Sequence, residues 1–89
     1  MIKIRRVCGD SMEPNIKNGS IAIVASFLKS KSGDVVLVQR GPKEFIKRIK
    51  NIDSDGRVYL SADNFFGSDS RNWGRLPGSS IKGKVIVNF

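Results

Sequence analysis

The stretch Asp34-Val-Val-Leu-Val-Gln-Arg40 carries the strongest strand signal in the chain. Four consecutive apolar residues are typical of a buried strand, and the pair Gly41-Pro42 that follows ends it. No segment of the sequence shows a sustained helical period of apolar residues. Working outward from this stretch, we expect an all-β fold.

Five further segments read as strands. They are short and apolar, and turn signals such as Asn18-Gly19 and Asp53-Ser-Asp-Gly56 separate them. Their ranges are 2–8, 21–25, 44–52, 57–61 and 83–89. Together the six segments predict a coiled, barrel-like antiparallel sheet. The turn-rich segment 62–80 is longer than a common connection, which indicates a functional role.

The length and composition describe one small domain. At 89 residues, the chain is expected to form a single domain over 1–89. No apolar run approaches the ~20 residues that a membrane span needs, and the N-terminus lacks the apolar region of a signal peptide. The single cysteine, Cys8, excludes an internal disulfide and is expected to be a packed small residue. We therefore expect a cytoplasmic protein.

The net charge of +8 raises the question of an anionic partner. Clustered Lys and Arg attract phosphate, but the basic residues here are scattered and no recognition helix is evident. The aromatic residues are not interleaved with them in an RNA-binding pattern. We expect no nucleic-acid partner, whereas peripheral contact with an acidic membrane surface is compatible with the charge.

The sequence contains no histidine. A Ser-His-Asp triad, a Cys-His pair and a histidine zinc site are therefore excluded within this chain, and no metal or other cofactor is expected. A nucleophilic serine would need another base. Lysine is the remaining candidate, because Ser-Lys pairs are a known variant of the same chemistry.

Ser11 lies within the turn-forming stretch Gly9-Asp-Ser-Met-Glu-Pro14. Glycine permits backbone angles that other residues resist, and proline fixes its own φ, so the hydroxyl between them is presented rigidly at the end of a strand. Two interpretations remain open from these residues alone. Ser11 is either a turn serine bonded to its own backbone or a nucleophile.

Lys47 is the candidate base. In an extended strand Phe45, Lys47 and Ile49 share one face, so the lysine has apolar neighbours on both sides. It either lays its stem on apolar surface with its amine in water, or keeps the amine dry. Burial lowers the pKa of a lysine below its usual value of about 10.4, which a base at neutral pH requires.

Several ordered segments carry a resemblance to a known family. They are Val7-Cys-Gly-Asp-Ser-Met-Glu-Pro14, Gly33-Asp-Val-Val36, Phe45-Ile-Lys-Arg-Ile49, Ala62-Asp-Asn64, Ser68-Asp-Ser-Arg71, Trp73-Gly74 and Ile81-Lys-Gly-Lys-Val85. In this order they resemble the boxes of type I signal peptidases and of the related LexA-type self-cleaving repressors. A lone Gly-x-Ser-Met is a weak signal, but the ordered set covers most of the chain.

The resemblance implies an all-β sheet of the LexA and signal peptidase type, and it implies roles for named residues. Ser11 would be the nucleophile and its backbone N–H an oxyanion donor, Lys47 the general base, and Met12 a wall of the substrate groove. Further residues would support the site as paired charges that brace the long segment: Arg48 with Asp63, and Asp69 with Arg71.

The chain also departs from the family pattern. Gly9 stands where a hydroxyl residue often assists the oxyanion, and Gly67 stands where a serine helps to orient the lysine. Ser68, next to Gly67, is then the candidate for orienting Lys47. We also expect no transmembrane anchor and no large inserted domain of the kind that bacterial signal peptidases carry.

These residues lead to one principal expectation. It is a signal peptidase-like serine endopeptidase, a compact maturation protease that uses a Ser-Lys dyad to remove a leader or propeptide from a specific precursor polypeptide. One alternative is the protease domain of a LexA-like self-cleaving repressor. The other is a non-enzymatic basic β-domain that binds nucleic acid, with Ser11 as a turn serine only.

Overall fold

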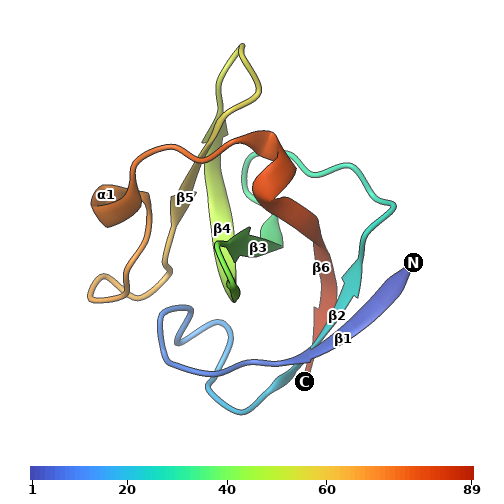
Figure 1. The fold of residues 1–89 in the computed structure, drawn as a ribbon. Helices are drawn as coiled ribbons and strands as arrows, with labels where there is room; N and C mark the ends of the chain where they lie inside the picture. Colours follow the sequence, from blue (N-terminus) through green and yellow to red (C-terminus); the bar gives the residue numbers. More distant parts are fainter.

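A computed structural model describes all residues from Met1 to Phe89. Six antiparallel strands form one coiled sheet in the order β1-β2-β6-β3-β4-β5 (Figure 1). The strands are β1 (Ile2–Arg6), β2 (Ile21–Ala25), β3 (Val35–Arg40), β4 (Lys43–Ile52), β5 (Val58–Ser61) and β6 (Ile81–Asn88). The expected all-β fold is confirmed. The sheet does not close into a full barrel, because β1 and β5 remain its two edges.

The β3–β4 hairpin joins a middle strand of the sheet, β3, to the strand that carries Lys47. Gly41 lies in its turn with a positive φ of 62°, a conformation that favours glycine. Val36 pairs with Lys47 and Val38 pairs with Phe45 across the two strands. Side chains of paired residues lie on the same face, so the apolar run of β3 and the lysine of β4 are brought together there.

Two apolar clusters pack against opposite faces of this hairpin. The first contains Val36, Val38, Ile49, Val58 and Leu60, with Trp73, Leu76 and Ile81 at its border. The second contains Val7, Met12, Ile16 and Ala22, with Val35, Ile46 and Val85 at its border. The alternation of inward and outward residues in β3 and β4 accounts for this division. Lys47 lies on the same face as the first cluster.

The long segment after β5 contains two short helical elements that the sequence does not predict. They are α1 (Ser70–Trp73) and the 3-10 turn η1 (Gly78–Ser80). Asp69 caps α1, because its side chain accepts a hydrogen bond from the Arg71 N–H. A helix of four residues is about one turn, too short to produce an amphipathic period. The last strand also begins earlier than expected, at Ile81 rather than at Gly83.

This segment seals the β5 edge of the sheet. The N–H of Val58 donates to Leu76 O at 2.8 Å. The N–H of Leu60 donates to Ser70 Oγ at 2.9 Å, and that of Ala62 donates to Asp69 Oδ2 at 2.7 Å. These N–H groups alternate along the outer edge, so no further strand can pair there.

The β1 edge, in contrast, is open. Val7 donates to Ser20 O and accepts from the Gly19 N–H, so its backbone groups point to the β2 side. Hydrogen-bonding direction alternates along an antiparallel strand, and the backbone groups of Ile4 and Arg6 therefore point away from β2. Only local side chains reach their carbonyls, Arg5 Nη1 donating to Ile4 O and Cys8 Sγ to Arg6 O.

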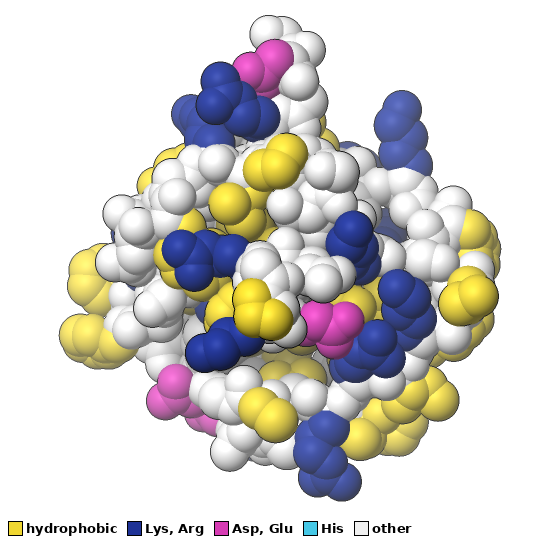
Figure 2. Space-filling view, viewed as in Figure 1, with side chains coloured by type: hydrophobic (Ala, Val, Ile, Leu, Met, Phe, Trp, Pro, Cys, Tyr) yellow, Lys and Arg dark blue, Asp and Glu magenta, His cyan; other side chains and the backbone are white.

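Basic residues are twice as numerous as acidic ones, with 16 Lys and Arg against 8 Asp and Glu. Lys and Arg side chains outnumber acidic ones on the face shown in Figure 2, and they are spread over it instead of forming one cluster. This matches the scattered distribution along the sequence. No helix of the structure has the length and apolar character that crossing a membrane requires.

Candidate active site

Ser11 lies in a tight turn that follows β1. The Glu13 N–H donates to Asp10 O at 3.0 Å and closes the turn around the serine. Gly9 precedes it with a positive φ of 96°, and its N–H donates to Asn18 Oδ1 at 2.9 Å. The glycine is required at this bend, because residues with a Cβ rarely adopt such an angle.

The Ser11 hydroxyl meets the Lys47 amine. Lys47 Nζ donates to Ser11 Oγ at 2.8 Å, although the two residues lie far apart in the sequence. Only 2% of the Lys47 side chain is exposed, so the amine does not reach bulk water. Of the two expectations for Lys47, the structure shows the one in which the amine is buried away from water.

Two aromatic rings lie near the amine. The Nζ atom lies 5.8 Å from the ring centroid of Phe45 and 5.5 Å from that of Trp73. The two rings pack on each other with their centroids 5.0 Å apart. Burial lowers the pKa of Lys47, and the nearby negative charge of Asp69 opposes this effect without cancelling it. The amine is thus biased toward its neutral form.

The backbone N–H of Ser11 has no intramolecular acceptor, either on the backbone or on a side chain. It lies beside the hydroxyl and is free to bind a negative oxygen. Gly9 supplies no side-chain donor there. The arrangement brings together a hydroxyl, a buried amine and a free N–H, which are the kinds of group that a nucleophile, a base and an oxyanion donor require.

The segment after β5 clamps the serine turn. The Asn64 N–H donates to Ser11 O at 2.7 Å, and Asn64 Nδ2 donates to Asp10 O at 3.1 Å. Gly67 packs so closely that a Cβ on it would stand 2.6 Å from Ser11 Cβ. The serine turn is therefore fixed from two sides, by hydrogen bonds and by steric contact.

Two ion pairs hold this segment in turn. Arg48 binds Asp63 through two parallel hydrogen bonds of 2.9 and 2.8 Å. Hydrogen bonding by Arg48 holds the pKa of the Asp63 carboxyl below its usual value. Arg71 Nε donates to Asp69 Oδ1 at 2.9 Å, and Arg71 Nη2 donates to the carbonyls of Phe65 and Gly67 at 2.7 and 2.9 Å.

Asp69 remains charged although it is 2% exposed. Burial raises its pKa, but hydrogen bonds from the Ala62 N–H and from Arg71 outweigh this, and the pKa is lowered overall. The carboxylate therefore accepts hydrogen bonds from the Ala62 N–H at the edge of the sheet, from the Arg71 N–H at the start of α1 and from the Arg71 side chain.

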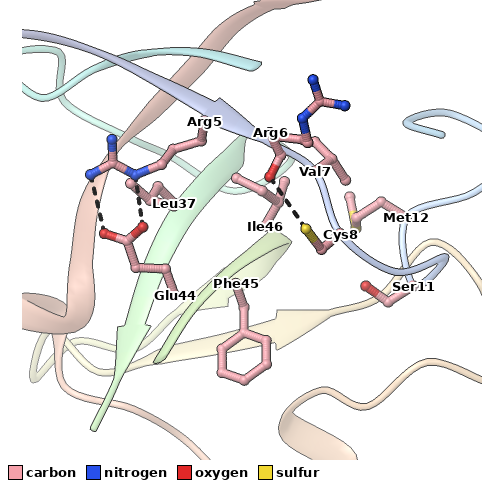
Figure 3. A pocket seen from close by; sticks show the side chains of 10 residues that line it. All are labelled: Arg5, Arg6, Val7, Cys8, Ser11, Met12, Leu37, Glu44, Phe45 and Ile46. Carbon is pink, nitrogen blue, oxygen red and sulfur yellow. Dashed lines mark hydrogen bonds and ion pairs between the residues drawn. The ribbon is translucent and has the colours of Figure 1, made fainter. Parts of the chain in front are cut away.

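A pocket of about 160 Å³ opens next to Ser11 (Figure 3). Its walls come from the end of β1, from the serine turn and from the β3–β4 hairpin. The lining residues are Arg5, Arg6, Val7, Cys8, Ser11, Met12, Leu37, Glu44, Phe45 and Ile46. The Met12 side chain is only 1% exposed, so it forms a wall of the pocket as part of the second apolar cluster.

A model of the family described as peptidase S24-like matches residues 2–72. The chain belongs to the peptidase S24-like family. The match includes β1, the serine turn, the lysine of β4 and both ion pairs around the segment after β5. It confirms the expected relationship to the LexA and signal peptidase superfamily, and it identifies the chain as a serine peptidase-like domain. No curated protein matches the chain.

Two expectations for this peptidase S24-like chain need correction. Ser68 is exposed, and no hydrogen bond joins its hydroxyl to Lys47, so the structure does not bring it to the amine. Cys8 is exposed instead of packed. The reason is that β1 ends at Arg6, after which Val7 turns inward and Cys8 turns outward. No group of three or more His, Cys, Asp or Glu side chains is placed to hold a metal ion.

Sequence reasoning missed three contributors to this peptidase S24-like site. Asn64 clamps the serine turn through its backbone and side chain. Trp73 packs near the amine, and Gly67 packs against the serine. The boxes Ala62-Asp-Asn64 and Trp73-Gly74 marked two of these positions, and Gly67 was noted as a departure from the family pattern, but none of these observations predicted the contacts.

Proposed function

We propose that this peptidase S24-like protein is a serine endopeptidase that uses Ser11 and Lys47 as a catalytic dyad to remove a leader or propeptide from a precursor polypeptide. The observation that carries the proposal is the contact of 2.8 Å between Lys47 Nζ and Ser11 Oγ. A hydrogen bond of this length suits proton transfer in either direction. Burial lowers the pKa of the amine, which favours the neutral form that a base needs.

The first half of the reaction forms an ester on Ser11. The neutral Lys47 amine takes the hydroxyl proton as Ser11 Oγ attacks the carbonyl carbon of the scissile peptide bond. The oxygen of the tetrahedral intermediate becomes negative and is bound by the Ser11 N–H. A donor of this kind is worth about 3 kcal/mol of the barrier. The Lys47 ammonium then gives its proton to the leaving nitrogen, and the C–N bond breaks.

The second half restores the enzyme. A water molecule gives a proton to the Lys47 amine and attacks the acyl carbon. The proton then returns from Lys47 to Ser11 Oγ as the ester C–O bond breaks, which releases the carboxylic acid product. Each proton taken by the amine is given back, so no further titratable group is needed.

The open edge of β1 supports binding of an extended polypeptide. The backbone N–H groups of Ile4 and Arg6 point away from β2 and offer hydrogen bonds to an added strand, while only local side chains reach the carbonyls of these residues. The pocket lies beside the same edge. Such a strand would pass the end of β1 and bring one of its carbonyls to Ser11. This supports a polypeptide substrate over a small molecule.

Cleavage of candidate precursor proteins tests the proposal. We expect Ser11→Ala and Lys47→Met each to lower turnover by about 10³-fold or more while the variants stay folded by circular dichroism. Lys50→Met, on the same strand but exposed, and Ser79→Ala, in η1, are matched controls that should keep wild-type turnover. Wild-type turnover in a folded Ser11→Ala variant would show that the dyad assignment is wrong.

A further inference from the structure

The pocket beside Ser11 ends at an ion pair. Arg5 of β1 binds Glu44 of β4 with hydrogen bonds of 2.7 Å from Nε and 3.3 Å from Nη2. Figure 3 shows this pair at one end of the pocket and Ser11 at the other, with Ile46 and Val7 between them. The strands β2, β6 and β3 separate β1 from β4 in the sheet, so the pair bridges the opening of the coil.

The walls between Ser11 and the pair are mostly apolar. Val7 and Met12 are buried on the β1 side, and Leu37 and Ile46 cover the hairpin side. A side chain that enters from the Ser11 end therefore passes apolar surface and then meets two opposite charges that already bind each other. Lys3 adds positive charge near Glu44.

Resting on the proposed function, we propose that the Arg5–Glu44 pair sets the charge selectivity of the substrate pocket. The pair admits an uncharged apolar side chain and disfavours a charged one. An acidic side chain would meet Glu44 and a basic one would meet Arg5, while the attractive partner of each is already engaged. Arg6 also lines the pocket, but its guanidinium points away from the pair (Figure 3). Rejection by like charge is a common source of specificity.

The residue that reaches the pair is removed from the scissile bond. Side chains i and i+2 of an extended chain share a face and lie about 7 Å apart. When one substrate residue lies beside Ser11, the side chain two positions away along the substrate therefore occupies the far end of the pocket. Arg5 and Glu44 are 37% and 36% exposed, so both become more desolvated when a peptide covers them, which makes an unpaired charge there more costly.

Breaking either half of the pair should create a preference of predictable sign. Glu44→Gln leaves Arg5 unpaired and should favour a glutamate in the peptide. Arg5→Gln leaves Glu44 unpaired and should favour a lysine, to a smaller extent because Lys3 still faces Glu44. We expect shifts of about fivefold in the ratio of dissociation constants for charged and leucine peptides.

The experiment measures binding without cleavage. Each variant is made in the Ser11→Ala background. The probes are fluorescent peptides of alanine and serine with blocked ends. Each peptide carries one leucine, glutamate or lysine, and the series places that residue at every position in turn. Asp55→Asn and Arg57→Gln are the matched controls, because they break an exposed ion pair of 3.1 Å in the β4–β5 turn and change the net charge in the same way.

Opposite shifts for Glu44→Gln and Arg5→Gln, confined to one peptide position and absent from the controls, support the proposal. Unchanged preferences, equal shifts in the controls, or no binding of any peptide overturn it. Cleavage of the leucine peptide by the wild type is scored separately. If the wild type does not cleave the leucine peptide but the binding preferences shift as expected, only the proposed function is rejected. If the wild type cleaves the peptide but the binding preferences do not shift, only the proposed selectivity is rejected.

Discussion

Gly67 lies so close to Ser11 that a Cβ on Gly67 would stand 2.6 Å from the Cβ of the serine. The same Cβ would stand 2.9 Å from that of Ala62. This contact leaves no room for a side chain at position 67. The segment after β5 approaches the serine turn more closely than any side chain there would permit.

Gly67→Ala should therefore displace the nucleophile. We expect kcat to fall by roughly 10²-fold, because a misplacement of about 1 Å has that effect on a positioned reaction, and stability to fall by about 1–3 kcal/mol from overpacking. Steady-state kinetics and urea unfolding check this. Gly78→Ala is the matched control, since its Cβ would stand 2.8 Å from Gly56 O, away from the dyad. It should lose stability but keep kcat, and an equal loss of kcat in both variants would contradict the positioning role.

Turnover should depend on the protonation of Lys47. The pKa of the buried amine is lowered from its ordinary value, and only the neutral amine accepts the serine proton. We expect kcat/KM to rise with pH and to reach a plateau below the ordinary lysine pKa of about 10.4. A pH–rate profile measures this. A profile that is flat, or that keeps rising through pH 10.4, would be inconsistent with a buried lysine base.

The lowered pKa of Lys47 should also make the stability of the protein depend on pH. The unfolded chain binds a proton at Lys47 more tightly than the folded chain does, so the free energy of unfolding increases with pH between the lowered pKa and about 10.4. Below that range the protonated amine destabilises the fold by a constant amount. Lys47→Met removes this cost and should stabilise the protein at pH 7 by about 0.5–2 kcal/mol, with the difference shrinking at higher pH. Urea unfolding at several pH values tests this, and Lys50→Met should show no such trend.

The charge of Asp69 should affect the pKa of Lys47. Its charge raises the pKa of Lys47 against the effect of burial, so Asp69→Asn should lower that pKa further and move the rise of kcat/KM to lower pH. Stability should fall, because the carboxylate also binds the Ala62 N–H and Arg71. Asp63→Asn is the control. It removes the ion pair with Arg48, but the charge of Asp63 does not contribute to the pKa of Lys47. Identical pH–rate profiles for both variants would exclude this electrostatic role.

Local patterns predicted the strands and marked Lys47 as a candidate base, whereas its pairing with Ser11 was implied by the family resemblance. They did not predict the contacts between distant loops. The apolar run 35–38 and the alternation of Phe45, Lys47 and Ile49 are periodic signals, and both segments form strands. The clamp by Asn64 uses mostly backbone groups, which any sequence possesses, so no residue type reveals it. Ser68 was a candidate for orienting Lys47 only because it is adjacent to Gly67. The turn of α1 directs Ser70 rather than Ser68 into the buried interior.

The sealing of β5 by residues 69–76 has a consequence for how copies of this chain meet. A sheet with two open borders can be extended without limit, whereas this one offers a single border, at β1. Two molecules joined there leave nothing for a third, so growth by strand pairing terminates at a pair and fibres cannot propagate by this route. That border also adjoins the pocket, so such a pair would compete with the proposed polypeptide substrate. A high concentration of the protein would then inhibit it instead of causing it to aggregate.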